Sequence, residues 1–164
     1  MFSVGDHVVY PYHGAGKVQD IEEKEILGKK LNYFIVFFPL NNVTLMLPEN
    51  KIGDSGLRSV IQESELAALR DALTANEAMP PENKSRSYSR ENELLLKTGS
   101  IFDAAHVIAQ LTAKEASRTN GLHIEDRKNL DRAQQFVLSE LKAVPFLTDS
   151  EAVHFLERHR QHTP

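Results

Sequence analysis

The sequence predicts an α+β protein whose strands and helices are segregated: an SH3-like or Tudor-like antiparallel β-barrel, followed by a compact all-helical domain of about five helices. Three observations support this fold class. Strand signals are confined to residues 1–48, residues 49–58 form a connector with two glycines, and the apolar period becomes helical from Ser64. Runs of strands followed by runs of helices are typical of α+β folds. We therefore expect two domains, residues 1–60 and 61–164.

The first two strands are predicted on either side of a sharp corner. Residues 7–10 and 17–21 are short β-branched segments, and Pro11, Gly14 and Gly16 interrupt the chain between them. The glycines fit a barrel corner that needs positive φ. A phosphate-binding loop is a poor alternative, because the third glycine, the following helix and the lysine–hydroxyl pair are missing.

The next two strands are predicted to form a hairpin. Residues 22–26 continue the second strand towards a turn at Gly28. Residues 33–38 are apolar at every position, so we expect both faces of the third strand to be covered. Asn41-Asn42 suits a tight turn because asparagine tolerates positive φ, and residues 43–47 return as the fourth strand.

The second half is predicted to contain five helices, each bounded by a breaking or capping residue. Pro80 and Gly99 end the first two helices, and the hydroxyls of Ser100 and Thr148 cap later ones. The polar residues 82–89 are expected to form a loop or an irregular helix start. The expected helices span about 64–79, 91–97, 101–116, 124–143 and 149–160.

Apolar residues recur every three or four positions along these helices, which places them on one face of each helix. We expect these faces to pack together into a core for the second half. The inward-facing residues are expected to be Leu66, Leu69, Leu73, Ile101, Ala105, Ile108, Leu130, Ala133, Val137 and Leu141.

The composition is that of an ordinary soluble globular protein, with 41% hydrophobic and 26% charged residues in a chain of 164. No apolar run approaches the roughly 20 residues that span a bilayer, and no charged and apolar leader opens the chain. We therefore expect a cytoplasmic protein. The absence of cysteine excludes disulfides and thiolate metal sites, and the seven histidines do not recur with carboxylates at ligand spacing.

The net charge of −4 argues against DNA binding by the chain alone. Proteins that hold DNA tightly by themselves are usually basic, because neutralising phosphates supplies much of the affinity. An acidic chain can still hold DNA through a local basic patch, or when another protein brings it there. The charge is therefore compatible with a factor that a partner delivers to DNA.

Five segments of the first sixty residues resemble one known family. They are Val-Gly-Asp-x-Val-Val-Tyr-Pro-x-His-Gly-Ala-Gly at 4–16, Ile-Glu-Glu-Lys-Glu-Ile-Leu-Gly at 21–28, the strand at 33–38, Met-Leu-Pro at 46–48 and Gly-Leu-Arg at 56–58. The pattern is similar to the N-terminal module of the CarD (CdnL) family of bacterial transcription regulators, which itself resembles the RNA-polymerase-interacting domain of transcription-repair coupling factors. In the second half, Lys-Thr-Gly-Ser at 97–100 and the helical run 126–141 are similar to the family's all-helical C-terminal domain.

The resemblance implies a non-enzymatic regulator of transcription initiation with two partners. The barrel would bind the RNA polymerase β subunit, and the helical domain would lie against promoter DNA just upstream of the melted region and stabilise open complexes. Binding to free DNA would be weak, because tethering to polymerase supplies a high effective concentration. The resemblance implies no cofactor, no membrane contact and no small-molecule substrate.

The resemblance places the polymerase contact on the strand pair around Lys24 and Met46, with Thr44 and Pro48 on the same strand as Met46. Family members often carry Arg at the positions of Lys24 and Met46. Lys24 keeps the charge without the bidentate fork of Arg, whereas Met46 replaces the charge with an apolar contact. The alternative is a solvated lysine and a half-buried methionine without a partner.

The resemblance places the DNA contact on cations of the second half. Family members wedge a Trp from the segment matching 83–89 into the minor groove, and Arg residues follow it closely. This chain has no Trp; Lys84 or Ser85 stands at that position, and Tyr88 is the only aromatic residue nearby. The candidate DNA contacts are Lys84, Arg86, Tyr88, Arg90, Lys97, Arg127, Lys128 and Arg132.

Two hypotheses therefore stay open for the helical half. It contacts promoter DNA, or it has lost DNA contact and the chain is a polymerase-binding or protein-binding module, with the cations forming an ordinary charged helix surface among acidic residues such as Asp126. The missing Trp and the negative net charge favour the second hypothesis. An enzyme is the least supported class, because no Ser-His-Asp or paired-carboxylate arrangement can be singled out by spacing.

Overall fold

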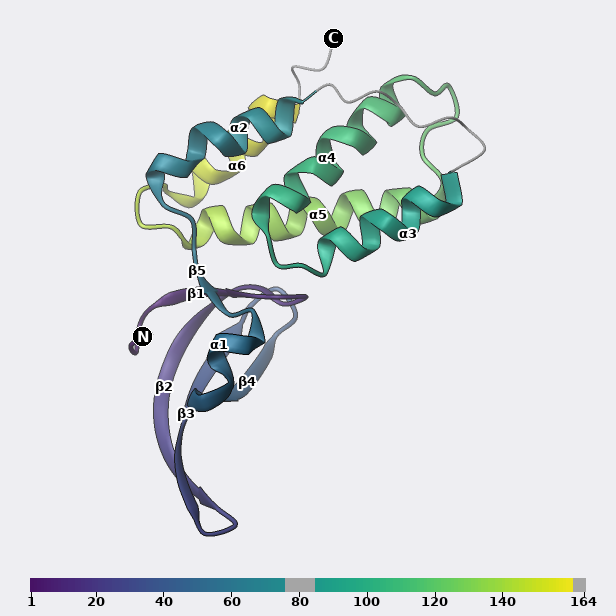
Figure 1. Ribbon diagram of the computed structural model, residues 1–164. Helices are drawn as coiled ribbons and strands as arrows, with labels where there is room; N and C mark the ends of the chain where they lie inside the picture. Colours follow the sequence, from purple (N-terminus) through teal and green to yellow (C-terminus); the bar gives the residue numbers. More distant parts are fainter. Residues whose placement is uncertain (76–84, 161–164) are drawn as a thin grey trace.

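The computed structural model describes residues 1–75 and 85–160, with the side chains of 85–87 and 159–160 excepted. A five-stranded antiparallel sheet comes first and a group of helices follows, stacked on one end of the sheet (Figure 1). The predicted α+β fold class, with strands and helices in separate halves, is confirmed.

The strands are connected in the order β4-β3-β2-β1-β5, and every neighbouring pair is antiparallel. The sheet curls around a small core in which Val8, Phe34 and Phe38 are almost fully buried. A short 3-10 turn and helix α1 connect β4 to β5, where the sequence predicted only a connector. The elements are β1 (His7–Tyr10), β2 (Gly14–Ile26), β3 (Lys29–Phe38), β4 (Val43–Pro48), η1 (Glu49–Lys51), α1 (Ile52–Ser55) and β5 (Arg58–Ser59).

The corner between β1 and β2 requires its two glycines for different reasons. Gly14 has φ 73°, as the sequence predicted for this corner. Gly16 does not have positive φ, but a Cβ atom there would lie 2.7 Å from the Phe37 carbonyl oxygen and 2.7 Å from the Phe38 ring. The strands can therefore pack this closely only because residue 16 has no side chain.

The two faces of β3 differ, and the expectation that both are fully covered is wrong. Phe34, Val36 and Phe38 are buried in the core of the sheet. The side chains between them alternate to the other face and are only half-buried. An uninterrupted apolar run therefore leaves apolar surface exposed on the outside of the sheet.

The five helices expected after residue 61 are present among the described residues, and two of them end elsewhere than predicted. The first stops at Thr74 rather than near residue 79, and Ala75 is already extended with ψ 119°. The second begins at Ser85 rather than at residue 91. The helical elements are η2 (Glu63–Glu65), α2 (Leu66–Thr74), α3 (Ser85–Leu96), α4 (Ile101–Ala116), α5 (Ile124–Ala143) and α6 (Asp149–Arg160).

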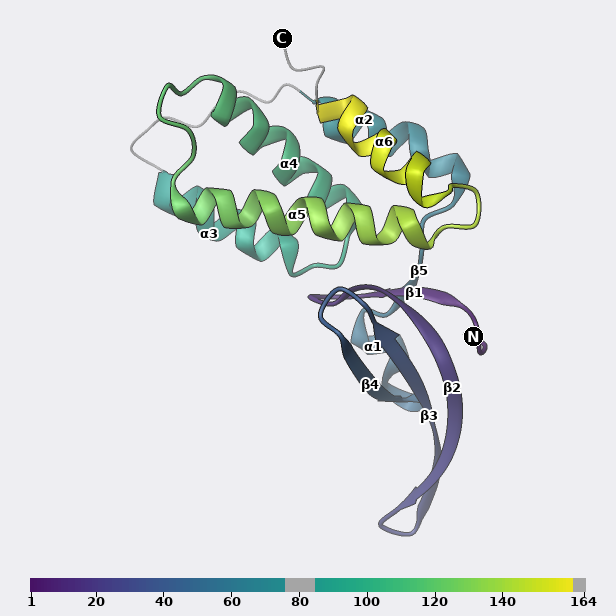
Figure 2. The ribbon, with the colours of Figure 1, turned by 180° about the vertical axis from the view of Figure 1, so that it is seen from behind.

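Helices α3 and α5 form the layer next to the sheet, and α4, α2 and α6 lie farther from it in both views (Figures 1 and 2). Their apolar faces form a second core, separate from the core of the sheet. All ten residues predicted to face inward belong to it, and only Leu66 is partly exposed. No helix among the described residues is long and apolar enough to cross a membrane.

One ionic cluster is buried among the helices. Asp126, 2% exposed, receives hydrogen bonds from Lys114 Nζ at 2.5 Å and from Ser89 Oγ at 2.7 Å. Asn129 also donates to the Ser89 carbonyl oxygen at 3.0 Å. These contacts hold the early turns of α3 against α5, which explains why α3 starts before its predicted position. Asp126 is therefore not one of the surface acids that the alternative of an ordinary charged helix surface included.

Candidate functional site

The outer face of the sheet is the surface opposite its core, and the strand register defines it. On β3, Tyr33 and Ile35 are half-buried here, and their partners on β4 are Pro48 and Met46. Because cross-strand partners point to the same side, the apolar side chains of the two strands form one continuous surface. The outer face consists of Lys17, Asp20, Glu22, Lys24, Leu31, Tyr33, Ile35, Phe37, Thr44, Met46 and Pro48.

All four predicted polymerase contacts lie on this face. Thr44, Met46 and Pro48 follow one another along β4, and Met46 is 44% exposed. Lys24 is paired with Leu31, beyond the end of β4, on the part of the β2–β3 hairpin that extends away from the helices. The structure therefore brings three of these residues together and sets Lys24 apart from them.

The tip of the β2–β3 hairpin presents apolar side chains that the sequence analysis did not select. Leu27 is 98% exposed and Ile26 is 48% exposed. Figure 1 shows this tip as the part of the sheet farthest from the helices. The signal was available in the sequence, because two large apolar residues stand directly before the predicted turn glycine.

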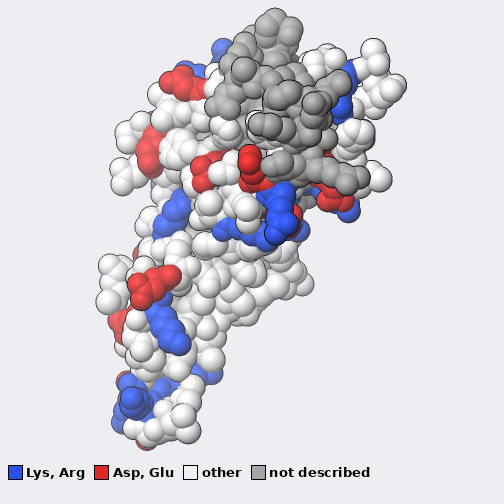
Figure 3. Space-filling view, turned by 45° about the vertical axis from the view of Figure 1, so that its right-hand side comes forward, with Lys and Arg blue, Asp and Glu red and all other residues white. Residues whose placement is uncertain are grey.

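A groove lies between α3, α5 and the corner that follows β1, and it gathers three of the predicted DNA contacts. Lys128 and Arg132 line the groove, which has a volume of about 390 Å³ and includes Tyr12. Lys97 Nζ lies 5.2 Å from the centre of the Tyr12 ring. Figure 3 shows basic side chains in a band at the boundary between the helices and the sheet, with acidic side chains above them.

The groove also contains acidic side chains that partly neutralise these cations. Lys97 pairs with Glu93 at 3.8 Å, and Lys128 pairs with Glu125 at 3.6 Å. These pairs are exposed, so each is worth at most about 1 kcal/mol and can exchange for a phosphate. Arg132 makes no ion pair among the described residues.

The other predicted DNA contacts are more scattered. Tyr88 is half-buried and Arg90 is exposed on α3, and Arg127 is exposed near the loop at Gly121. Lys84 lies outside the described residues, as does the side chain of Arg86.

A buried ion pair joins the sheet to the helices, and the sequence analysis did not find it. Arg58 on β5 donates two hydrogen bonds to Glu140 on α5, at 2.8 and 2.5 Å. The same guanidinium donates to the Gly99 carbonyl oxygen at 3.0 and 2.7 Å, and Glu140 also accepts from the Ile61 amide at 2.8 Å. Glu140 is 2% exposed, so the carboxylate of this bidentate pair is shielded from water, whereas the Arg58 side chain is 31% exposed. A signal existed, because Glu140 follows Val137 by three residues on the apolar face of its helix.

Smaller contacts complete this junction. The Ser139 hydroxyl accepts a hydrogen bond from the Ala15 amide at 3.2 Å. Added Cβ atoms would lie 2.8 Å from Ser139 Oγ at Gly14 and 3.2 Å from Pro11 at Gly99. The corner after β1 is thus packed directly against α5 and the turn before α4.

The histidines and carboxylates of the described residues do not gather into a metal site. No group of three or more His, Asp or Glu side chains in residues 1–75 and 85–160 is close enough to hold a metal ion. The His13 ring stacks on Tyr10 with ring centres 5.5 Å apart, and it meets the Phe38 ring at a tilt with centres 5.3 Å apart. His7, the first residue of β1, is exposed.

Family models match both halves of the chain. The model of the CarD-like/TRCF RID domain matches residues 2–61, and the model of the CarD C-terminal domain matches residues 68–157. The two matches together span most of the chain, and they separate at the junction between β5 and α2.

One curated protein and one solved structure are similar to this chain. The Bacillus subtilis (strain 168) protein named "Putative transcription factor YdeB" is 31% identical over 161 residues, covering 94% of this chain and 99% of its own length. The solution structure of the 72-residue N-terminal domain of Myxococcus xanthus CarD is 36% identical, with a TM-score of 0.32, over 36% of this chain and 79% of that domain.

Proposed function

This chain belongs to the CarD family of transcription-associated proteins, and from that premise we propose that it regulates transcription initiation by binding RNA polymerase and promoter DNA. Residues 1–60 bind the polymerase β subunit, and residues 61–164 contact DNA upstream of the melted region and stabilise the open complex. The observation that supports this most is the partly exposed apolar outer face of a sheet that matches the CarD-like/TRCF RID domain.

The outer face has the properties of a protein-binding surface. Its apolar side chains are continuous from Tyr33 and Ile35 on β3 to Met46 on β4, and such exposed patches mark interaction sites. In addition, β4 is an edge strand that pairs only with β3. A strand of the partner can therefore extend the sheet at β4 while its side chains pack against Met46.

The helical half supplies a weak DNA contact that acts once polymerase has brought it to the promoter. Lys97, Lys128 and Arg132 surround one groove and can meet phosphates. The Glu93 and Glu125 carboxylates beside them reduce the affinity for free DNA. Tethering to polymerase compensates by raising the effective DNA concentration to roughly millimolar.

A second candidate function is that of a protein-binding module without DNA contact. The ion pairs of Lys97 and Lys128 within the chain favour it, as does the absence of an aromatic wedge. In that case the helices would bind a protein partner, and polymerase binding through the sheet would be unchanged.

Charge reversal in the helical half separates the two functions. The variant carries Arg127→Glu and Lys128→Glu, and a control carries Arg70→Glu and Arg158→Glu, which make the same charge change on α2 and α6. We expect the first variant to co-elute with polymerase normally and to shorten the lifetime of promoter open complexes, whereas the control behaves as the unmodified chain. Unchanged open-complex lifetimes with the first variant, together with normal co-elution, would favour the protein-binding module. Failure of the unmodified chain to co-elute with polymerase would overturn both functions.

A further inference from the structure

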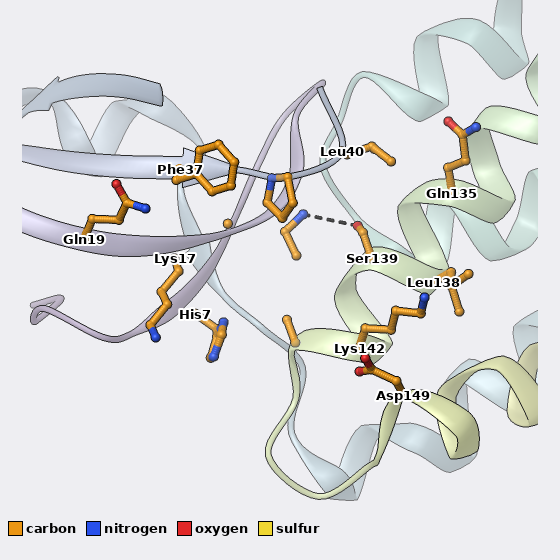
Figure 4. A pocket seen from close by; sticks show the side chains of 14 residues that line it. His7, Lys17, Gln19, Phe37, Leu40, Gln135, Leu138, Ser139, Lys142 and Asp149 are labelled. Carbon is orange, nitrogen blue, oxygen red and sulfur yellow. Dashed lines mark hydrogen bonds between the residues drawn. The ribbon is translucent and has the colours of Figure 1, made fainter. Parts of the chain in front are cut away.

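A pocket lies where the sheet meets the helices, and none of the predicted polymerase or DNA contacts lines it. Its volume is about 550 Å³, within the roughly 300–1,000 Å³ typical of sites for small organic molecules. β1, β2, β3 and the β3–β4 turn form one wall, and α5 with the start of α6 forms the other (Figure 4). We call it the interface pocket.

The inside of the interface pocket is mostly apolar. Phe37 and Leu40 contribute from the sheet, and Leu138 and Ala143 contribute from α5. Between the walls, the hydrogen bond from the Ala15 amide to Ser139 Oγ fixes their spacing (Figure 4). The pocket is therefore formed before any ligand arrives, so binding loses little free energy to ordering of its side chains and loops.

The rim of the interface pocket is basic. Lys17 from β2 and Lys142 from α5 stand on opposite walls, and His7 lies beside Lys17 (Figure 4). Neither ammonium makes an ion pair or hydrogen bond within the described part of the chain. One carboxylate, that of Asp149, also lines the pocket.

These unpaired ammonium groups distinguish the interface pocket from the groove beside Tyr12. In that groove Lys97 and Lys128 already have carboxylate partners within the chain. Lys17 and Lys142 are exposed, and each long side chain can turn towards an anion at the mouth of the pocket without first leaving a partner.

We propose that the interface pocket binds a small organic anion with a flat apolar body and a single acidic group. The apolar body lies between Phe37, Leu40 and Leu138, and the acidic group lies at the rim within reach of Lys17 or Lys142. Such a ligand contacts the sheet and α5 together, so it stabilises the arrangement of the two halves. This proposal does not depend on polymerase or DNA binding.

The test uses two dyes that share one apolar body. They are 8-anilino-1-naphthalenesulfonate, which carries one sulfonate, and N-phenyl-1-naphthylamine, which lacks it. Each dye is titrated by fluorescence into the folded full chain, and NMR spectra of the chain show which backbone amides shift. We expect saturable binding of the sulfonate dye, with shifts at Gly16, Lys17 and Lys142.

Two variants and a control then separate the apolar and ionic contributions. The double variant Lys17→Ala, Lys142→Ala should weaken binding of the sulfonate dye about tenfold and leave binding of the neutral dye unchanged. The variant Ala143→Phe should prevent binding of both dyes, and the control Lys29→Ala, Lys51→Ala should change neither. If Ala143→Phe does not fold, the lysine variant alone decides the question. Equal weakening of both dyes, an unchanged affinity for the sulfonate dye, or shifts confined to other surfaces would overturn the proposal.

Discussion

At Gly16 the sheet has no room for a side chain. A Cβ there would meet both the Phe37 carbonyl oxygen and the Phe38 ring, and the carbonyl cannot move without disturbing the strand ladder. We expect Gly16→Ala to lower the free energy of unfolding by about 2 kcal/mol, measured by urea titration. The control is Gly53→Ala, because Gly53 has open space around it and no positive φ. Equal stability of the two variants would contradict the assigned close packing.

Met46 is the residue on which the polymerase proposal depends most. It is 44% exposed at the centre of the apolar part of the outer face, opposite Ile35. We expect Met46→Asp to weaken co-elution with RNA polymerase at least tenfold, because an unpaired charge would be buried in the complex. Val4→Asp is the matched control, since Val4 is 58% exposed and precedes the first strand of the sheet. Normal co-elution of Met46→Asp with polymerase would show that polymerase binds a different surface of the chain.

Charged residues were the hardest to place from the sequence alone. Asp126 and Glu140 occupy inward positions of α5, four residues before Leu130 and three after Val137, so helical periodicity alone would bury them. Carboxylates are normally exposed, and only a partner reverses this expectation. The partners Lys114 and Arg58 come from other elements, and the sequence contains no local signal that brings them together.

Elements with local capping signals were predicted well, and elements without them were not. The Ser100 hydroxyl accepts from the Asp103 amide and the Thr148 hydroxyl accepts from the Glu151 amide, so α4 and α6 begin where the sequence predicted. The start of α3 has contacts with α5 instead, which no nearby residue encodes. Strand β5 was missed for a similar reason, because its two residues are defined only by pairing with β1.

The ion pair between β5 and α5 is an element-scale contact whose disruption we expect to lower stability. Removing one partner of a fully buried ion pair leaves an uncompensated charge, which typically costs about 3–5 kcal/mol. The Arg58 side chain is 31% exposed, so the cost here belongs at the lower end of that range. We therefore expect Glu140→Gln to destabilise the chain by about 3 kcal/mol and to lower the urea midpoint. Glu23→Gln is the control, because Glu23 pairs with Lys30 at 4.0 Å on the exposed surface.

A double-mutant cycle tests whether this stability comes from the pair itself. The double variant Arg58→Met, Glu140→Met should lose clearly less free energy of unfolding than the sum of the losses in the two single variants. The reason is that the double variant leaves no buried charge unpaired. Strictly additive effects would show that Arg58 and Glu140 act separately.

In the whole molecule, the proposed polymerase contact and the proposed DNA contact lie on different surfaces, the first on the sheet and the second where the sheet meets the helices. The hairpin tip, which carries Lys24, extends away from the helices (Figure 1). The groove beside Tyr12 is lined by residues of α3, α5 and the corner after β1, at the boundary between the halves. The Arg58–Glu140 pair and the packed corner after β1 join the two halves directly. We infer that the surfaces of the two proposed contacts are held in a defined geometry.

The salt dependence of DNA binding follows from the number of cations in the groove. If Lys97, Lys128 and Arg132 each meet one phosphate, the logarithm of the affinity for free promoter duplex should fall against the logarithm of salt with a slope of about −3. Arg132→Gln should reduce this slope by about one, measured by fluorescence anisotropy. A slope near zero would instead favour the module without DNA contact.

Site-specific cross-linking from position 46 tests the polymerase proposal most directly. A photoreactive amino acid replaces Met46 in the full chain, and the same group at Val4 serves as the control. After irradiation with purified RNA polymerase, we expect position 46 to become joined to the β subunit and position 4 to give no such product. Cross-links from position 46 to a different subunit, or to none, would contradict the proposal that the outer face of the sheet binds the β subunit.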